Sequence, residues 1–270
     1  QHCQHNRQQH RRMPSHPPLR RHPLLSGTLA TFCLLVAATA QAGTVTVAVA
    51  ANFAGPMARI AEGFAAATGH TVKTSAGPTG KFYSQIIQGA PFDLLIAADD
   101  ATPKKLIADG HAVAGSNFTY AIGLLALWSA QPAVVDDQGA VLASGRFNKL
   151  AVANPKLAPY GAAAMQVIQA RSLTDAITPK LVTGESIAQT YQFVFTGNAE
   201  LGFVALSQVV GPGKPVTGSH WRVPSNLYGE IRQDAVLLKN GAKNPAATAL
   251  LDYLKSPAAK AVIQSHGYGG

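Results

Sequence analysis

The sequence predicts an α/β protein of two lobes, each a mostly parallel sheet flanked by helices, with the second lobe inserted in the first. Three observations predict this fold. Apolar runs rich in β-branched residues alternate with segments of helical spacing after residue 43, which is typical of βαβ units. The alternation breaks near 120–128 and resumes at residue 150. Finally, 47% of the 270 residues are hydrophobic and 13% are charged, a composition that excludes disorder.

The elements before residue 110 follow from periodicity and from helix-end signals. The run VTVAVA indicates a buried strand, and Gly69 ends the helix after it. Thr102 is expected to be an N-cap, with Pro103 in the first turn. In chain order we expect a strand at 45–50, a helix at 56–67, a strand at 70–74, a turn at 77–80, a helix at 81–88, a strand at 93–98 and a helix at 102–109.

The elements after residue 110 complete the two lobes. We expect one long strand at 120–128, a polar loop at 136–145, strands at 150–153, 201–206 and 234–238, and helices at 160–170, 185–195, 245–255 and up to 264. The chain is expected to cross between the lobes near 120–127 and 225–236, which would be the two hinge crossings. We therefore assign 43–122 and 228–270 to lobe 1 and 123–227 to lobe 2. A ligand should bind between the lobes, beside the carboxyl ends of the strands.

The first 42 residues, 1–42, indicate a leader with a secretory signal peptide. Basic residues precede the apolar stretch 23–39, and Ala40-Gln41-Ala42 matches an A-x-A cleavage site. We expect cleavage after Ala42 and export to the periplasm, with Met13 as the true start. A membrane anchor is the alternative, but the apolar stretch is short and is interrupted by Ser26-Gly27-Thr28.

The positive charge belongs mostly to the leader. The chain has 22 basic and 13 acidic residues, and five arginines but no acid lie in the leader, so the rest carries only +4. This weakens any prediction of nucleic-acid binding. Both cysteines, Cys3 and Cys33, also lie in the leader, which excludes a disulfide framework, a cysteine-ligated zinc and a thiol nucleophile from the body.

Four segments share one pattern: the end of a strand, a small or hydroxyl residue, and the start of a helix. They are Ala50–Phe53, Gly77–Gly80, Pro159–Gly161 and Gly184–Ile187. Helix N-termini bind anions through free backbone N–H groups, and each carries roughly half a positive charge. The side chains of Asn52, Thr79 and Tyr160 add neutral donors. Alternatively, Asn52 and Thr79 are only N-caps, and it is the set of four segments that favours a site.

Motifs for catalysis are absent or incomplete. Gly80-Lys81 would need Gly at position 75 and Ser or Thr at 82 to form a P-loop, but Ser75 and Phe82 stand there. The histidines after residue 42 are scattered. We expect no catalytic residue, and we interpret Asp99-Asp100 as closing a turn. The alternative is an enzyme acting on an anionic substrate, with Asp99 or Glu185 as general acid/base.

Several segments, in this order, resemble the periplasmic molybdate-binding proteins of ABC importers. They are VAVAANF at 47–53, GPTGKFY at 77–83, GAPFDLLIAAD at 89–99, LAVANP at 150–155, LGFV at 201–204 and DYLKSP at 252–257. The resemblance spans nearly all of 44–268. It implies the two-lobe fold of type II periplasmic binding proteins, with hinge closure around the ligand.

The resemblance also implies which residues bind the oxyanion. The first loop corresponds to Asn52 with Ala51 beside it, and the second to Thr79, where Ser is usual in the family. Tyr160 matches the third position and Ile187 the fourth, where Val is frequent. Some members use a tyrosine after the strand matching Leu201–Val204. This chain has Ala205 there, and one hypothesis is that Tyr160 takes over that role.

The implied function is capture of molybdate, and of tungstate, for an inner-membrane ABC permease. The metal would be held through its oxygens by the same residues, with no direct metal ligands. No cofactor and no nucleic acid are expected, and the protein is expected to be a monomer. Another tetrahedral oxyanion such as sulfate remains an alternative ligand, because the size of the pocket does not follow from the sequence.

Overall fold

The computed structural model describes residues 42–215 and 217–269. The predicted signal peptide, its start at Met13 and both cysteines fall in residues 1–41, outside the described residues. Residues 41–270 form one compact unit. No helix in the described ranges has the length and apolar character needed to cross a membrane.

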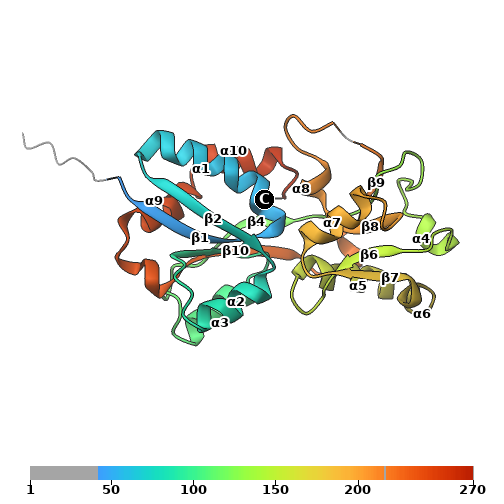
Figure 1. The fold of residues 1–270 in the computed structure, drawn as a ribbon, viewed down its shortest axis with the longest axis horizontal. Coiled ribbons are helices and arrows are strands. Elements are labelled where there is room, and N and C mark those ends of the chain that lie inside the picture. The colour runs from blue at the N-terminus through green and yellow to red at the C-terminus, as the bar shows by residue number, and fades with distance from the viewer. Residues whose placement is uncertain (1–41, 216, 270) are drawn as a thin grey trace, which may run out of the picture. The chain divides into compact units, whose positions relative to one another are not determined.

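The first lobe is built on a five-stranded mixed sheet (Figure 1). Its strands are β1 (Thr44–Ala50), β2 (Thr71–Gly77), β3 (Leu94–Ile96), β4 (Phe118–Gly123) and β10 (Ile231–Leu237), in the order β2-β1-β3-β10-β4. β1 pairs in parallel with β2 and β3, whereas β10 runs antiparallel to β3 and β4. The chain therefore returns from the second lobe into the middle of this sheet, on β10.

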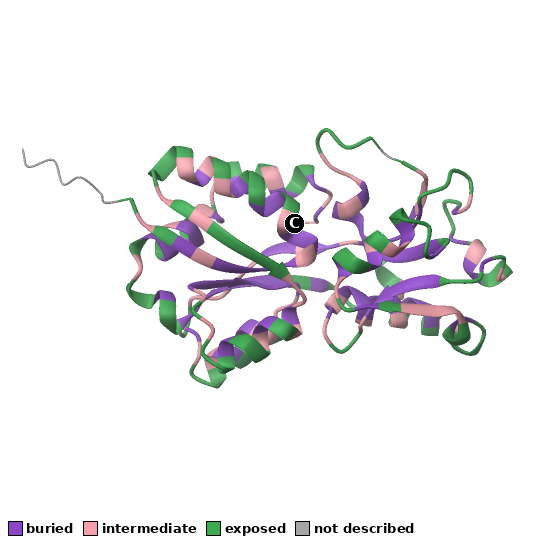
Figure 2. Ribbon diagram, viewed as in Figure 1, coloured by how far each residue is buried: buried purple, intermediate pink, exposed green. Residues whose placement is uncertain are grey.

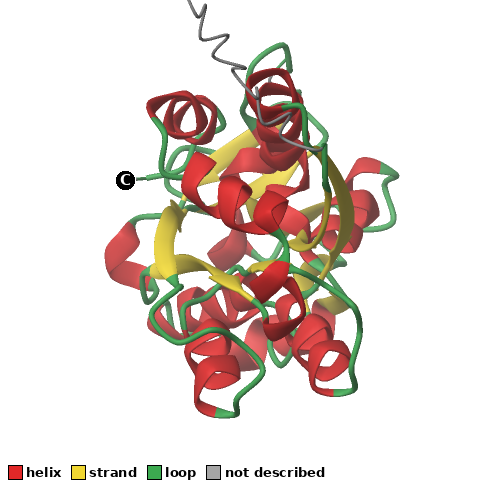
Figure 3. Cartoon of the chain, turned by 90° about the vertical axis from the view of Figure 1, so that its left-hand side faces the viewer, coloured by secondary structure: helices red, strands yellow, loops and turns green. Residues whose placement is uncertain are grey.

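Helices cover both faces of this sheet (Figure 3). They are η1 (Ala51–Phe53), α1 (Ala54–Thr68), α2 (Thr79–Ile87), α3 (Ala101–Ala108), η4 (Lys239–Lys243), α9 (Pro245–Tyr253) and α10 (Pro257–Ser265). Val47 and Val49 pack with α1, α9 and α10, while Ala48 packs with α2 and α3. Because alternate residues of β1 are buried on opposite faces, the strand is apolar almost throughout (Figure 2).

The second lobe repeats the arrangement. Its strands are β5 (Leu125–Ser129), β6 (Leu150–Ala153), β7 (Leu181–Gly184), β8 (Leu201–Ala205) and β9 (Ser219–Arg222), in the order β7-β6-β8-β5-β9. β6 pairs in parallel with β7 and β8, and β5 runs antiparallel to β8 and β9. Its helices are α4 (Val141–Ser144), α5 (Pro159–Ala170), α6 (Thr174–Ile177), η2 (Thr178–Lys180), α7 (Ile187–Phe195), α8 (Leu206–Val209) and η3 (Ser225–Leu227).

The prediction of a single strand over residues 120–128 is wrong. This run is two strands, β4 and β5, which belong to different sheets and meet at Leu124. Both strands are largely buried, so the sequence stays apolar through the crossing and no polar turn marks it. The chain returns to the first lobe between Arg222 and Ile231, through η3.

Thr102 is not the N-cap of α3, because the helix already begins at Ala101. Instead, the carboxylate of Asp99 accepts the N–H of Thr102 at 2.8 Å and its hydroxyl at 3.1 Å. The interpretation of Asp99 as a residue that closes this turn is confirmed. Similarly, α2 begins at Thr79 rather than at Lys81, so the expected turn is the start of the helix.

The remaining differences concern short elements. β7 and β9 were not predicted, because both are edge strands of four residues with one buried position each. The loop expected at 136–145 contains the single turn of α4. The predicted fold class, two lobes with mostly parallel sheets flanked by helices, is confirmed.

Gly161 tests how closely α5 packs against the end of β6. A side-chain carbon there would overlap the carbonyl of Ala153 at the end of β6, whereas one at Gly55 in α1 would meet no atom within 4 Å. We expect Gly161→Ala to destabilise the protein by about 1–3 kcal/mol, because a close-packed contact would be overfilled.

Gly55→Ala is the matched control, since it also replaces a glycine near the start of a helix. We expect it to be neutral or to stabilise the protein by up to about 1 kcal/mol. Thermal unfolding of both variants measures the difference. Equal melting temperatures of the two variants would contradict close packing of α5 against β6.

Candidate functional site

A small cavity lies where the starts of four helices converge. Its lining residues are Ala50, Ala51, Asn52, Gly77, Pro78, Thr79, Ala98, Ala158, Pro159, Tyr160 and Ile187. All five residues proposed from the sequence are among them: Ala51, Asn52, Thr79, Tyr160 and Ile187. The first lobe contributes the starts of η1 and α2, and the second contributes the starts of α5 and α7.

Strand register explains why these helix starts lie together. β1 and β2 are parallel and end level, at the pair Ala50 and Gly77, so the chain turns into η1 and α2 at the same edge of the sheet. β6 and β7 end level in the same way, at Ala153 and Gly184. In parallel sheets, ligands bind at this carboxyl edge of the strands.

The residues at the N-termini of α5 and α7 favour the start of a helix at these positions. Pro159 occupies the first turn of α5, where its missing N–H costs nothing. Ser186 caps α7 by accepting the N–H of Gln189 at 3.2 Å. The first N–H groups of a helix lack an intrahelical acceptor, so helix starts provide backbone donors and positive dipole ends for a ligand. Some of these N–H groups are already bonded here: Gly80 donates to the carbonyl of Leu157, and Gln189 to Ser186.

Thr79 adds a side-chain donor. The residue is 1% exposed, and its hydroxyl oxygen accepts the N–H of Ala98 at 3.0 Å. A hydroxyl has a single hydrogen, which remains free for a second acceptor once the oxygen has accepted a bond. No charged residue lines the cavity. The site therefore suits a small ligand that carries negative charge and accepts hydrogen bonds.

Asn52 plays a different part from the one expected. Its amide nitrogen donates to the Gln233 side-chain oxygen at 3.0 Å, to the Tyr268 hydroxyl at 2.9 Å and, less closely, to the Tyr160 hydroxyl at 3.4 Å. The amide hydrogens are thus used within the protein. As a donor for a ligand, Asn52 can still offer its backbone N–H, which lies in the first turn of η1.

The hydroxyl of Tyr160 is also engaged. It accepts a bond from the side-chain nitrogen of Gln233 at 2.9 Å, and the residue is 1% exposed. Burial raises the pKa of this hydroxyl well above its ordinary value. Tyr160 therefore stays protonated and uncharged at neutral pH, and the site acquires no negative charge from it.

The two carboxylates that an enzyme would use lie outside the cavity lining. Glu185 is exposed and pairs with Lys81 at 3.4 Å, an ion pair that joins the two lobes. Asp99 lies in a larger neighbouring cleft of about 330 Å³, which shares Ala98, Ala158 and Pro159 with the cavity. Burial raises the pKa of Asp99.

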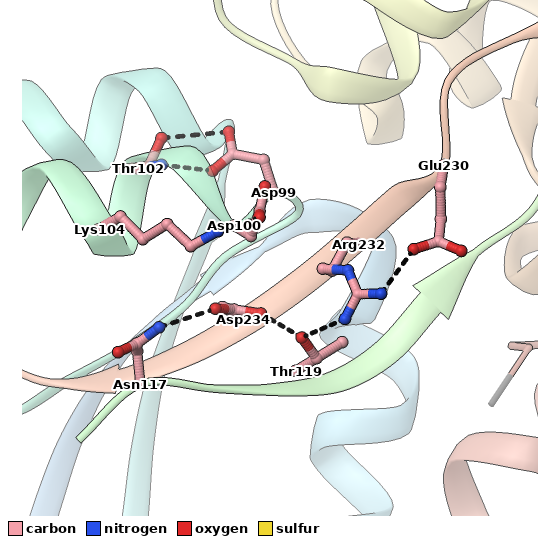
Figure 4. A network of polar contacts seen from close by, with 9 residues as sticks. All are labelled: Asp99, Asp100, Thr102, Lys104, Asn117, Thr119, Glu230, Arg232 and Asp234. Atoms are coloured by element: carbon pink, nitrogen blue, oxygen red, sulfur yellow. Dashed lines mark hydrogen bonds and ion pairs between the residues drawn. The ribbon is translucent and has the colours of Figure 1, made fainter. Parts of the chain in front are cut away.

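Figure 4 shows the polar contacts beside that cleft, which include two ion pairs. Asp100 pairs with Lys104, which lowers the pKa of the carboxyl. Arg232 pairs with Glu230 at 3.0 Å and donates to the Thr119 hydroxyl at 3.3 Å. Within 42–215 and 217–269, no group of three or more His, Cys, Asp or Glu side chains could hold a metal ion.

Three residues next to the site were not predicted: Ser207, Gln233 and Tyr268. All three are buried, and all hydrogen-bond directly to Asn52. In the sequence, Gln233 stands out only as a polar residue directly before the strand predicted at 234–238. Ser207 and Tyr268 carried no signal, because nothing local distinguishes them from surface residues.

Comparisons with known proteins show which family the chain belongs to. Residues 45–269 match the family described as bacterial extracellular solute-binding protein. The chain is 62% identical over 235 residues to the molybdate-binding protein ModA of Azotobacter vinelandii, covering 87% of this chain and 93% of the relative. It is 54% identical to the Rhodobacter capsulatus protein of the same name, covering 86% and 91%.

A solved structure confirms the fold. The periplasmic molybdate-binding protein of Azotobacter vinelandii matches with a TM-score of 0.82 and 42% identity, covering 84% of this chain and 99% of that one. The sulfate-binding protein SubI of Mycobacterium tuberculosis, at 13% identity and a TM-score of 0.69, shares the fold alone. The resemblance found in the sequence is therefore confirmed, and the chain belongs to the bacterial extracellular solute-binding protein family.

Proposed function

We propose that this protein captures molybdate, and tungstate, between its two lobes and delivers the oxyanion to an ABC permease. The observation that carries the proposal is the cavity itself: helix starts from both lobes surround it, and no charged side chain lines it. The relatives named as molybdate-binding proteins support the same ligand. In this proposal Ala51, Asn52, Thr79, Tyr160 and Ile187 bind the oxyanion, chiefly through backbone N–H groups.

The charge state of the ligand explains a site made of donors. Molybdate and tungstate are dianions without a proton at neutral pH, so they only accept hydrogen bonds. Burying such an ion without partners would cost tens of kcal/mol. Each hydrogen bond to a charged group contributes about 1.5–3 kcal/mol, so several donors offset the cost. Phosphate retains a proton near neutral pH and would also need an acceptor, which the lining does not supply as a carboxylate.

Contacts between the lobes suggest capture by closure. The N–H of Gly80 in α2 donates to the carbonyl of Leu157 in the second lobe at 3.0 Å, and Lys81 pairs with Glu185 nearby. A ligand that bonds to both lobes favours the closed arrangement over an open one. The same proposal includes four further points. The closed form docks on a permease, and the protein is exported to the periplasm with cleavage after Ala42. It needs no cofactor, and it is a monomer.

Thr79 tests the ligand assignment. We expect Thr79→Val, which keeps the volume but removes the hydroxyl, to weaken molybdate binding about 10-fold, in line with the loss of one bond to a charged group. Thr79→Ser should bind nearly as well as the wild type. Calorimetric titration of the mature protein measures both affinities.

The same titration, run with tungstate, sulfate and phosphate, checks the choice of oxyanion. Tungstate should bind comparably to molybdate, and the other two much more weakly. Tight binding of sulfate alone would replace the proposed ligand with another tetrahedral oxyanion, and no response to any of the four ions would contradict an oxyanion site.

Gly80 tests closure. A side-chain carbon there would lie 3.2 Å from the Leu157 Cα and 3.3 Å from its carbonyl oxygen, both in the opposite lobe. We expect Gly80→Val to obstruct closure and to weaken molybdate binding about 5- to 150-fold, because overfilling a packed contact costs about 1–3 kcal/mol. Small-angle scattering should show less compaction on adding molybdate than in the wild type, and equal compaction with equal affinity would argue against the mechanism.

Asp99 separates the binding protein from the enzyme alternative. Because burial raises its pKa, the folded state holds this proton more tightly than the unfolded chain. The resulting stability is full below the ordinary pKa of 3.8 and is lost as the pH rises through the folded-state pKa. We expect the Asp99→Asn variant to have a melting temperature equal to or above that of the wild type at pH 7. The difference in melting temperature should disappear toward pH 4. Molybdate affinity should be retained, whereas loss of binding would give Asp99 a direct role.

A further inference from the structure

A buried group of polar side chains adjoins the cavity, and we call it the junction cluster. Its members are Asn52, Tyr160, Ser207, Gln233 and Tyr268. None is more than 6% exposed. Asn52, Gln233 and Tyr268 come from the first lobe, and Tyr160 and Ser207 from the second. Two members, Asn52 and Tyr160, also line the cavity, so the cluster joins the site to both lobes.

Tyr268 holds Asn52 at two points. Its hydroxyl accepts the side-chain amide of Asn52 at 2.9 Å and donates to the backbone carbonyl of Asn52, also at 2.9 Å. The hydroxyl of Ser207, in α8 of the second lobe, donates to the same tyrosine oxygen at 3.1 Å. One phenol group therefore links the first binding turn to the opposite lobe.

The end of the chain fixes the position of Tyr268. Gly269 pairs with Ile122 of β4 through two backbone bonds of 2.9 and 3.0 Å. The ring of Tyr268 packs edge-on against Phe53, with 5.5 Å between the ring centroids. Because Ile122 lies next to the crossing between the lobes, the tail is anchored where the lobes join.

Gln233 completes the link between the two residues that line the cavity. Its side-chain oxygen accepts from Asn52 at 3.0 Å, and its nitrogen donates to Tyr160 at 2.9 Å. Gly123 leaves room for this bridge, since a side-chain carbon there would overlap both the Tyr160 hydroxyl and the Gln233 amide. Asn52 is thus oriented by Gln233 as well as by Tyr268.

We propose that Tyr268, supported by Gln233, is a positioning residue that orients the turn at Asn52 so that its backbone N–H groups face the oxyanion. The inference rests on the proposed function. Donors held in place before the ligand arrives lose little freedom when it binds, whereas a mobile turn must be ordered at the expense of affinity. Tyr268 does not line the cavity, so it acts through Asn52.

Tyr268→Phe tests the proposal, because phenylalanine keeps the packing on Phe53 and removes only the hydroxyl. We expect molybdate binding about 5- to 10-fold weaker than in the wild type, the effect of one hydrogen bond. The control is Ser129→Ala, which also removes one buried hydroxyl. That hydroxyl donates to the carbonyl of Glu200 at 2.7 Å, and neither residue lines the cavity or lies in a hinge crossing. The control should lower the melting temperature to a similar extent and leave the affinity unchanged.

A double-mutant cycle separates positioning from a general loss of stability. In an Asn52→Ala background, Tyr268→Phe should weaken binding less than it does in the wild type, because one of the two bonds between these residues is already lost and only the bond to the backbone carbonyl remains. Ser207→Ala should weaken binding in the same direction as Tyr268→Phe, and it provides the test if the tyrosine variant does not fold. Additive effects, or an unchanged affinity in Tyr268→Phe, would overturn the inference. Failure of the wild type to bind molybdate would instead reject the proposed function.

Discussion

The proposed binding site depends on backbone N–H groups that lack an intrahelical partner at the starts of helices. Every helix leaves such groups at its first turn, and burying them without partners is unfavourable. Here four such starts surround one cavity, and two of them belong to each lobe. A ligand that accepts hydrogen bonds can gain donors from both lobes at once. Binding and closure of the lobes are therefore the same physical event in the proposed mechanism.

Neutral hydrogen-bond donors make an anion site more selective than a charged side chain would. A lysine or arginine in the lining would attract any anion, including protonated ones, whereas fixed N–H and O–H donors favour ligands that only accept. In the neighbouring cleft, Arg232 is paired with Glu230, and Lys156 lines that cleft and not the cavity. Tyr160 adds no charge, because burial raises its pKa. Selectivity is thus attributed to donor geometry rather than to net charge.

The sequence predicted most of the fold and the residues that line the cavity, because both depend on local patterns. Asn52, Thr79 and Tyr160 were found from their place between a strand and a helix, whereas Ala51 and Ile187 were assigned from the family resemblance. Strand register then brings all five to one cavity. The function came from the resemblance, not from periodicity. Local patterns failed at Leu124, where two buried strands are joined without a turn. They also could not connect Asn52 with Gln233 and Tyr268, which lie 181 and 216 residues further along the chain.

The matching strand orders of the two sheets have a consequence for the shape of the ligand. β1 and β2 hold the same places in the first sheet as β6 and β7 hold in the second. The loops at the cavity therefore form two corresponding pairs. The four equivalent oxygens of a tetrahedral ion can be grouped as two opposite edges of two oxygens each. Each pair of loops can face one edge, so the matching strand orders let both lobes approach the proposed cargo in the same way.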